Sequence, residues 1–538
     1  MPDSRTRRLS AVLAPLKAPL NGLLTLALAA FGVSAFAQTP QGEHISALYQ
    51  QHCAVCHGEQ RTGGMGPALL PESLERIRAP EIERVIAQGR TATQMNGFSG
   101  QLSEQEIKAM SAWIRTPVIP APVWKNADIT ASRIFHEDEA NAPDKPVWDA
   151  DPMNLFLVVE GGDHHVSILN GDTFEVIKRF PSRFALHGGP KFTPDGRYVF
   201  FGSRDGWITK YDLWRLRVVA EVRAGLNMRN VAVSSDGRYV MAANYLPHTV
   251  ALFDSGLNLI RTYDAQSAAG GSSRVSAVYD AEPRKSFVVA LKDIPEIWEI
   301  PYGSASPSRA GPDLQTATMN QALEHLSIRR TTLSEPLDDF FFDQSYRHVL
   351  GATRARAQGD TQPSAQVVDL DQRRKIADLP LSGMPHLGSG ITFAWNGTTV
   401  LASPNLGTGT IDVIDMKDWK PVRTLPMPGP GFFMRSHENT PYAWTDSMMS
   451  PKAKDTLTII DKRTLEVAAQ VKEPGKTLAH IEFTRDGKYA LASLWEMDGA
   501  VIVYDANTFK EIKRLPMSKP VGKYNVWNKI TRSEGTSH

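Results

Sequence analysis

The octapeptide FTPDGRYV at residues 192–199 decides the fold, because close copies of it recur along the chain. The copies are VSSDGRYV at residues 233–240 and FTRDGKYA at 483–490, and AWNG at 394–397 is a looser one. Each joins an Asp-Gly or Asn-Gly turn to an apolar run, which is typical of a β-hairpin. A later strand in each copy then ends in aspartate, at Asp212, Asp254, Asp415 and Asp505.

The spacing of the copies indicates the architecture. Asp195 and Asp236 are 41 positions apart (236 minus 195), which fits the ~40–45 residues of a four-stranded propeller blade. A propeller accommodates many antiparallel repeats and leaves no long exposed edge strand. We therefore predict an all-β propeller over residues 124–538, preceded by a separate domain, since one core rarely grows beyond ~250–300 residues.

The two cysteines of the chain lie together in the run CAVCH at residues 53–57. C-x-x-C-H is the attachment pattern of c-type heme. Two thiols one helical turn apart can add to the two vinyl groups of one porphyrin, and His57 can then ligate the iron. A redox disulfide between Cys53 and Cys56 is the alternative, but it leaves His57 without a role. We predict one covalently attached heme c.

The flanks of this motif predict a small all-α cytochrome c domain over residues 38–116. Ile45 and Tyr49 recur at helical spacing before the motif. Ser103 with Glu106 forms a capping box that opens a closing helix. A stiff proline-rich linker follows at residues 117–123.

Two methionines compete as the sixth ligand of the heme c iron. Met95 lies in the loop TQMNG at residues 93–97, and Met65 lies in the run GMGP at 64–67. A thioether ligand raises the reduction potential and leaves no open coordination position, which suits electron transfer. We predict Met95, with a core-packing role as the simpler alternative.

Residues 1–37 predict a signal peptide. Basic residues precede the apolar run from Leu20 to Phe36, which ends in the small-residue pattern AFA at 35–37. A retained membrane anchor is the alternative, but the run is shorter than the ~20 residues that a spanning helix needs. We expect a mature chain in the periplasm without a membrane span. The balance of 59 Lys plus Arg against 58 Asp plus Glu gives no reason to expect nucleic acid as a partner.

Three histidines and one arginine share a position within the repeat, six to ten residues before the turn. They are His187, Arg229, His386 and His480. The strand that enters this turn is the innermost strand of a blade, so these side chains should converge on one mouth of the central channel. Each taken alone is explained as a hydrogen-bonded loop residue, but the shared phase favours a common site. The sequence has no second C-x-x-C-H, so we predict a second, non-covalent metal macrocycle, with Arg229 able to meet a carboxylate.

The sequence resembles the heme d1 proteins, whose best-known member is cytochrome cd1 nitrite reductase. The resemblance rests on FALH at 184–187, FGSRDG at 201–206, MPH at 384–386 and GKYNV at 522–526. It implies an eight-bladed propeller that holds heme d1 or dihydro-heme d1. It also implies that His187 and His386 ligate the iron from opposite faces, with Arg204 in a cofactor-binding segment.

One departure from nitrite reductases guides the choice within this family. Where they have the first of two distal histidines, this chain reads LDDF at residues 337–340. The pattern resembles the dihydro-heme d1 dehydrogenases, which implies oxidation of a propionate to an acrylate with electrons leaving through heme c. A small electron-transfer protein would accept them, and cytochrome cd1 nitrite reductase would receive the product. His480 and Tyr524 are the candidates for the base and for the group that holds the substrate carboxylate, in either order. A nitrite reductase with an unusual distal site and a non-catalytic heme d1 carrier are the alternatives.

Overall fold

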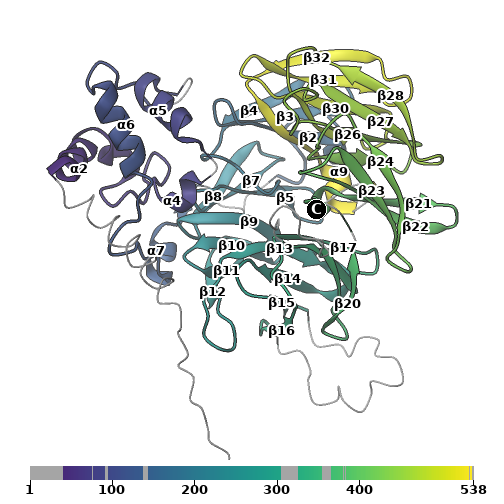
Figure 1. Ribbon diagram of the computed structural model, residues 1–538, viewed down its shortest axis with the longest axis horizontal. Helices are drawn as coiled ribbons and strands as arrows, with labels where there is room; N and C mark the ends of the chain where they lie inside the picture. Colours follow the sequence, from purple (N-terminus) through teal and green to yellow (C-terminus); the bar gives the residue numbers. More distant parts are fainter. Residues whose placement is uncertain are drawn as a thin grey trace, which may run out of the picture.

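A helical N-terminal part stands beside a ring of β-sheets in the computed structural model (Figure 1). The structure describes residues 40–535 except 76, 91–94, 137–142, 304–324, 354–364, 380, 382, 532 and 533. The signal peptide predicted at residues 1–37 lies outside the described residues. Among the residues that are described, no helix is long and apolar enough to span a membrane. The prediction of an α-helical domain followed by a β-propeller is confirmed.

Within the described residues, the helices of the N-terminal part are α2 (Pro40–His52), α3 (Ala54–His57), α4 (Pro71–Leu74), α5 (Ala79–Gln88) and α6 (Glu104–Trp113). Ile45 and Tyr49 of α2 are buried, as their helical spacing predicts. The predicted capping box opens α6, with the Ser103 backbone N–H donating to Glu106 over 2.8 Å. The apolar faces of α2, α5 and α6 meet in one core.

The described residues form eight sheets, and each is one blade. From the innermost strand outward, the first four blades are β33 (Pro520–Asn525), β2 (Leu155–Glu160), β3 (His165–Asn170) and β4 (Val176–Pro181); β5 (Lys191–Phe192), β6 (Tyr198–Gly202), β7 (Trp207–Asp212), β8 (Arg217–Arg223) and an added β1 (Ile134–Phe135); β9 (Asn227–Val233), β10 (Tyr239–Leu246), β11 (Thr249–Asp254) and β12 (Leu259–Asp264); β13 (Val275–Ala281), β14 (Ser286–Leu291), β15 (Glu296–Pro301) and β16 (Arg329–Thr332).

The remaining four blades follow the same order from the channel outward. They are β17 (Asp339–Phe342), β18 (His348–Ala352), β19 (Ala365–Asp369) and β20 (Arg374–Leu379); β21 (Ile391–Trp395), β22 (Thr398–Pro404), β23 (Thr410–Asp415) and β24 (Pro421–Pro426); β25 (Met434–Ser436), β26 (Tyr442–Asp446), β27 (Thr456–Asp461) and β28 (Glu466–Lys472); β29 (Leu478–Phe483), β30 (Tyr489–Leu494), β31 (Gly499–Asp505) and β32 (Glu511–Met517).

The two ends of the propeller segment close the ring. The C-terminal strand β33 pairs antiparallel with β2, with Tyr524 opposite Leu157. The innermost strand of the first blade therefore comes from the end of the chain, and no inner edge is left open. Helix α9 (Val526–Thr531) follows β33 directly and contacts the innermost strand β5, so it lies in the middle of the ring (Figure 1).

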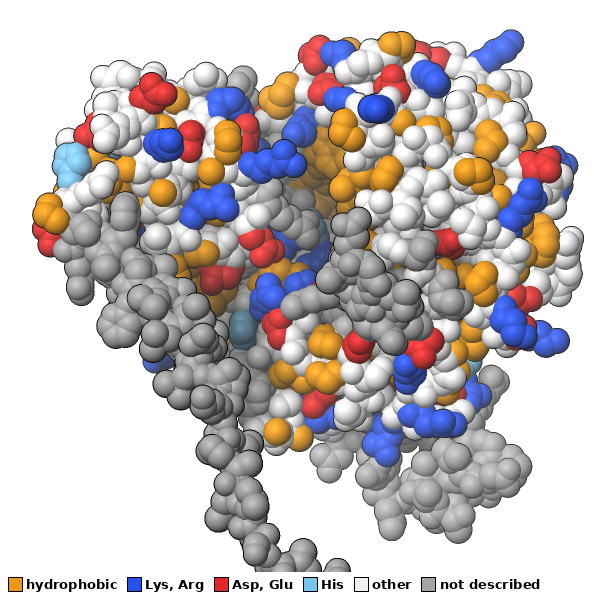
Figure 2. Space-filling model, in the orientation of Figure 1, with side chains coloured by type: hydrophobic (Ala, Val, Ile, Leu, Met, Phe, Trp, Pro, Cys, Tyr) orange, Lys and Arg blue, Asp and Glu red, His pale blue; other side chains and the backbone are white. Residues whose placement is uncertain are grey.

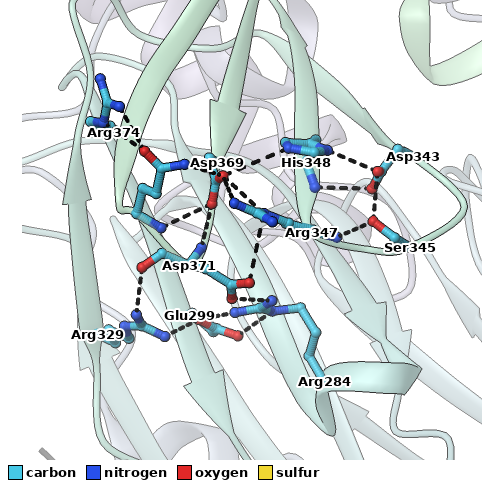
Figure 3. Close-up of polar contacts among 11 residues, drawn as sticks. Arg284, Glu299, Arg329, Asp343, Ser345, Arg347, His348, Asp369, Asp371 and Arg374 are labelled. Carbon is cyan, nitrogen blue, oxygen red and sulfur yellow. Dashed lines mark hydrogen bonds and ion pairs between the residues drawn. The ribbon is translucent and has the colours of Figure 1, made fainter. Parts of the chain in front are cut away.

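Hydrogen bonds explain why the repeat has its sequence. The hydroxyl before the turn donates to the turn aspartate, as from Ser234 to Asp236 over 2.7 Å. Gly237 at the next position has φ +71°, which favours glycine. Blade 5, which begins with β17, lacks the Asp-Gly turn but keeps the aspartate at the end of its third strand (Figure 3). There, Arg347 donates to the buried Asp369 at the end of β19 over 2.7 Å, as Arg197 donates to Asp212 at the end of β7 over 3.2 Å.

Candidate heme sites and active site

His57 is held in the orientation that an iron ligand needs. Its Nδ1 donates to the backbone oxygen of Pro67 over 2.8 Å, which leaves the Nε2 lone pair for a metal. Cys53 and Cys56, on either side of the start of α3, are both free thiols. A Cβ atom at Gly66 would lie 2.8 Å from the imidazole, so only glycine lets the backbone pass this close to the ring. These residues fit a covalently attached heme c.

The two candidate methionines differ in exposure. Met65 is 75% exposed, whereas Met95 is half-buried and its backbone oxygen accepts a hydrogen bond from the Arg90 N–H over 3.0 Å. The rest of the Met95 loop, residues 91–94, lies outside the described residues. Burial favours Met95, which stays a prediction as the sixth ligand.

His187 lies at the mouth of the propeller just before β5. Its Nδ1 is 2.8 Å from the backbone oxygen of Arg229, to which it donates. The guanidinium groups of Arg204 and Arg229 lie 3.3 and 3.4 Å from His187 Nε2. The Arg229 guanidinium also lies 3.9 Å from the carboxylate of Asp339, and its pairing with a carboxylate of the macrocycle stays a prediction. Two cations therefore stand beside the predicted proximal histidine.

His386 precedes β21 and is held in the same manner as His187. Its Nδ1 donates to the backbone oxygen of Phe432 over 2.8 Å, and the two rings have centroids 4.1 Å apart. Burial lowers the pKa of His386, which keeps the imidazole neutral. In both histidines Nδ1 donates a hydrogen bond to a backbone carbonyl oxygen. Nε2 is therefore the nitrogen suited to bind iron.

His480 interrupts the innermost strand β29. A bulge between Ala479 and Ile481 and a φ of +48° turn its side chain out of the regular register. The ring is 1% exposed, and its Nδ1 has no hydrogen-bond partner among the described residues. The Tyr524 ring lies with its centroid 5.2 Å from that of His480.

The electrostatics of these two candidates differ. Burial, together with the cations Lys523 and Arg435, lowers the pKa of His480 well below its ordinary range. Burial raises the pKa of Tyr524 to about 12. At neutral pH, His480 therefore has a lone pair that can accept a proton, and Tyr524 keeps its hydroxyl proton.

Further contacts join the predicted residues into one site. Phe432 contacts His386 and Phe433 contacts His480, and these two phenylalanine rings pack together with centroids 4.6 Å apart. Tyr524 and His187 line the same small cavity. The structure thus gathers the residues predicted for the propeller site: His187, Arg204, Arg229, His386, His480 and Tyr524.

The sequence analysis gave no role to several polar groups in and beside the channel. Asp339, which stands where nitrite reductases have a histidine, accepts a hydrogen bond from Tyr279 over 3.0 Å and pairs with Arg229. Arg435 and Glu482 are 3% and 0% exposed. Asp339 could have been predicted as a residue of the site, because it begins the innermost strand β17. Arg435 lies in a blade without a recognisable repeat, so no sequence signal pointed to it.

The cytochrome part packs on the side of the propeller that holds these residues. Arg223, at the end of β8, donates to the backbone oxygen of Thr62 over 2.6 Å. Leu70 packs on Leu226, which lies between β8 and β9. Figure 2 shows Lys and Arg side chains gathered in the hollow between the two parts. The cytochrome part therefore contacts the propeller where β8 leads into the innermost strand β9.

Comparison with known proteins places the chain in a family. Residues 150–529 match the family model described as cytochrome D1 heme domain. The chain is 52% identical over 494 residues to the dihydro-heme d1 dehydrogenase of Pseudomonas aeruginosa, covering 91% of this chain and 95% of that protein. The chain belongs to the dihydro-heme d1 dehydrogenase family. A solved structure of the dihydro-heme d1 dehydrogenase NirN in complex with DHE superimposes with a TM-score of 0.83 at 52% identity, over 90% of this chain and 99% of that one.

Two further matches are consistent with this family assignment. Residues 40–114 match the family model described as cytochrome c oxidase, cbb3-type, subunit III, which covers the helical part. The nitrite reductase of Stutzerimonas stutzeri is 26% identical over 564 residues, covering 95% of this chain and 97% of that protein. The sequence identity to the dehydrogenase is thus twice that to the reductase. This agrees with the prediction of a dehydrogenase from the LDDF run at residues 337–340.

Proposed function

We propose that this protein is a dihydro-heme d1 dehydrogenase that binds dihydro-heme d1 and oxidises one propionate side chain to an acrylate. The observation that carries the proposal is the pair of histidines, His187 and His386, whose rings are each fixed at the propeller mouth by an Nδ1–H that donates to a backbone carbonyl. The 52% identity to a dehydrogenase of this name supports it. The reaction removes two protons and two electrons from adjacent carbon atoms of the side chain.

Each product of this oxidation needs an acceptor. Heme c, attached through Cys53 and Cys56 and ligated by His57, supplies a one-electron redox centre when bound. We propose that His480 accepts the substrate proton, because its neutral imidazole is buried beside Tyr524. Tyr524 keeps its proton and donates a hydrogen bond to the substrate carboxylate. The guanidinium groups of Arg204 and Arg229 pair with the other carboxylates of the macrocycle.

We also propose where the protein acts and which partners it has. Residues 1–37 direct the chain to the periplasm, residues 38–116 form the cytochrome domain, and the linker at 117–123 leads to the propeller at 124–538. A small electron-transfer protein accepts the electrons, and a cytochrome cd1 nitrite reductase receives the product. A pull-down of the loaded protein with each candidate partner tests these contacts.

One assay distinguishes the three functions. The protein is loaded with dihydro-heme d1, an electron acceptor is added, and the extracted macrocycle is analysed by mass spectrometry. Loss of two hydrogen atoms from the macrocycle supports the dehydrogenase, and an unchanged mass with tight binding supports a carrier. Nitrite turnover on the order of 1 s⁻¹ or faster, typical of a metabolic enzyme, supports a reductase.

A further inference from the structure

A cavity of about 460 Å³ extends from Pro190, which also lines the small cavity beside His187, to the opposite end of the propeller channel. Its wall includes Pro194, Ser234 and Asp343, which belong to turns that follow innermost strands. His187 and His386 instead come before innermost strands. Because these strands run in one direction through the ring, the two sets of residues lie at opposite ends of the channel.

Helix α9 lines this cavity, and Lys529 on that helix borders the cavity and also lies near Tyr524. Lys529 lines the cavity, and its Nζ lies 5.5 Å from the centroid of the Tyr524 ring. The His480 ring centroid lies 5.2 Å from that of Tyr524. Tyr524 is thus a shared neighbour of the proposed base and of an amine that borders the cavity.

The surroundings of Lys529 disfavour its charged form. Burial lowers its pKa well below the ordinary range, the cations Arg435 and Lys191 lower it further, and Glu482 raises it. These groups face it from β25, β5 and β29, and Tyr524 faces it from β33. A lysine whose charged form is disfavoured in this way gives up its proton more readily than a surface lysine does.

The chemistry requires such a group. Forming the acrylate leaves two protons at His480 or its neighbours, and His480 is only 1% exposed. We propose that Lys529 relays these protons from the active site into the cavity and so to solvent. The neutral amine takes a proton from the imidazolium of His480, by way of the Tyr524 hydroxyl or a water molecule, and passes it to water in the cavity. The electrons leave separately through heme c. This inference rests on the proposed dehydrogenase function.

The test compares Lys529→Met with the control Lys420→Met, whose side chain is 75% exposed on the surface. Conversion of dihydro-heme d1 is followed with excess electron acceptor from about pH 6 to about pH 9. We expect Lys529→Met to slow conversion by about 10-fold or more, with heme c content and macrocycle binding unchanged. Lys529→Arg should be equally slow, because a guanidinium does not give up its proton. In Lys529→Ala, added ethylamine should restore conversion in proportion to its unprotonated fraction.

Two results would overturn the relay. Conversion by Lys529→Met within about 2-fold of wild type, with the same pH profile, would show that protons leave by another route. Slow conversion that no amine restores, with an unchanged pH profile, would assign Lys529 a structural role only. Failure of the wild-type protein itself to convert dihydro-heme d1 would instead refute the proposed function on which the relay rests.

Discussion

The backbone of His480 is held in a strained conformation. Its φ of +48° lies in the left-handed region, which costs a non-glycine residue on the order of 1–3 kcal/mol. Two buried charged side chains hold this conformation. The Lys523 ammonium donates to the His480 backbone oxygen, and the His480 N–H donates to Asp446. Strain that is held in this way at a buried histidine is typical of a functional site.

Substitution of the two candidate active-site residues should slow conversion in different ways. His480→Gln removes the proposed base, and we expect conversion of dihydro-heme d1 to fall by about 10²-fold or more. Tyr524→Phe removes one hydrogen bond to the substrate carboxylate, so macrocycle affinity should fall as well. Conversion rates and binding titrations measure both effects, and heme staining checks that heme c is retained. Equal rates for wild type and His480→Gln would exclude this residue as the base.

Gly66 provides a prediction about the heme c site. A Cβ at this position would lie 2.8 Å from the His57 ring, so Gly66→Ala should displace the imidazole. We expect a lower heme c content or a shifted reduction potential, measured by heme staining and redox titration. Gly100→Ala is the control, because a Cβ there meets nothing within 4 Å. The prediction fails if the two variants behave alike.

The site could be predicted from sequence where its residues share a phase within the repeat. His187, Arg229, His386 and His480 precede comparable turns, and the structure gathers them. Lys529 could not be found in this way, because its position depends on helix α9, which contacts strands β2 and β5 that are more than 300 residues away in sequence. Sequence order alone carries no signal for that contact.

At the scale of the elements, the blades vary in sequence more than in structure. The first blade takes its inner strand from residues 520–525, so no local pattern reveals it. The fourth blade replaces the Asp-Gly turn with a short 3-10 helix, η2 (Glu282–Arg284). The repeat therefore predicted the architecture from a few regular blades. The number of eight came from the family resemblance and is confirmed by the eight sheets of the described residues.

The turn network of blade 5 gives a prediction about pH (Figure 3). Burial would raise the pKa of Asp369, but hydrogen bonds from Arg347 and from the Gln372 backbone outweigh this and lower it. A carboxyl whose pKa is lower in the folded state contributes stability above its unfolded pKa of ~3.9, and loses this as the pH falls through the folded value. Asp369→Asn should cost on the order of 1–3 kcal/mol at pH 7.

This cost should shrink as the pH falls below ~4, because the wild-type carboxyl then becomes protonated too. Urea denaturation of both proteins at several pH values measures the difference in free energy of unfolding. Asp418→Asn serves as the control, since Asp418 lies on the surface and binds only Lys420. A difference between wild type and Asp369→Asn that is constant with pH would contradict the assignment.

At the scale of the whole molecule, the contact between the cytochrome part and the propeller sets the electron path. Arg223 joins them, donating to Thr62 over 2.6 Å and to the backbone oxygen of Asp205 over 2.8 Å. Arg223→Ala should loosen this contact by on the order of 1–3 kcal/mol. We expect slower reduction of heme c by bound substrate in stopped-flow experiments, with substrate affinity unchanged. Arg238→Ala, at a side chain 59% exposed, is the control, and equal rates in both variants would contradict this role for Arg223.

The central claim is that this chain moves two electrons from a macrocycle side chain through heme c. The most direct measurement counts electrons delivered to an external acceptor for each acrylate formed, with the mass of the extracted macrocycle recorded in parallel. We predict two electrons for each macrocycle that loses two hydrogen atoms, and no transfer in a Cys53→Ser, Cys56→Ser variant that lacks heme c. A macrocycle that stays bound with its mass unchanged, while no electrons reach the acceptor, would contradict the account.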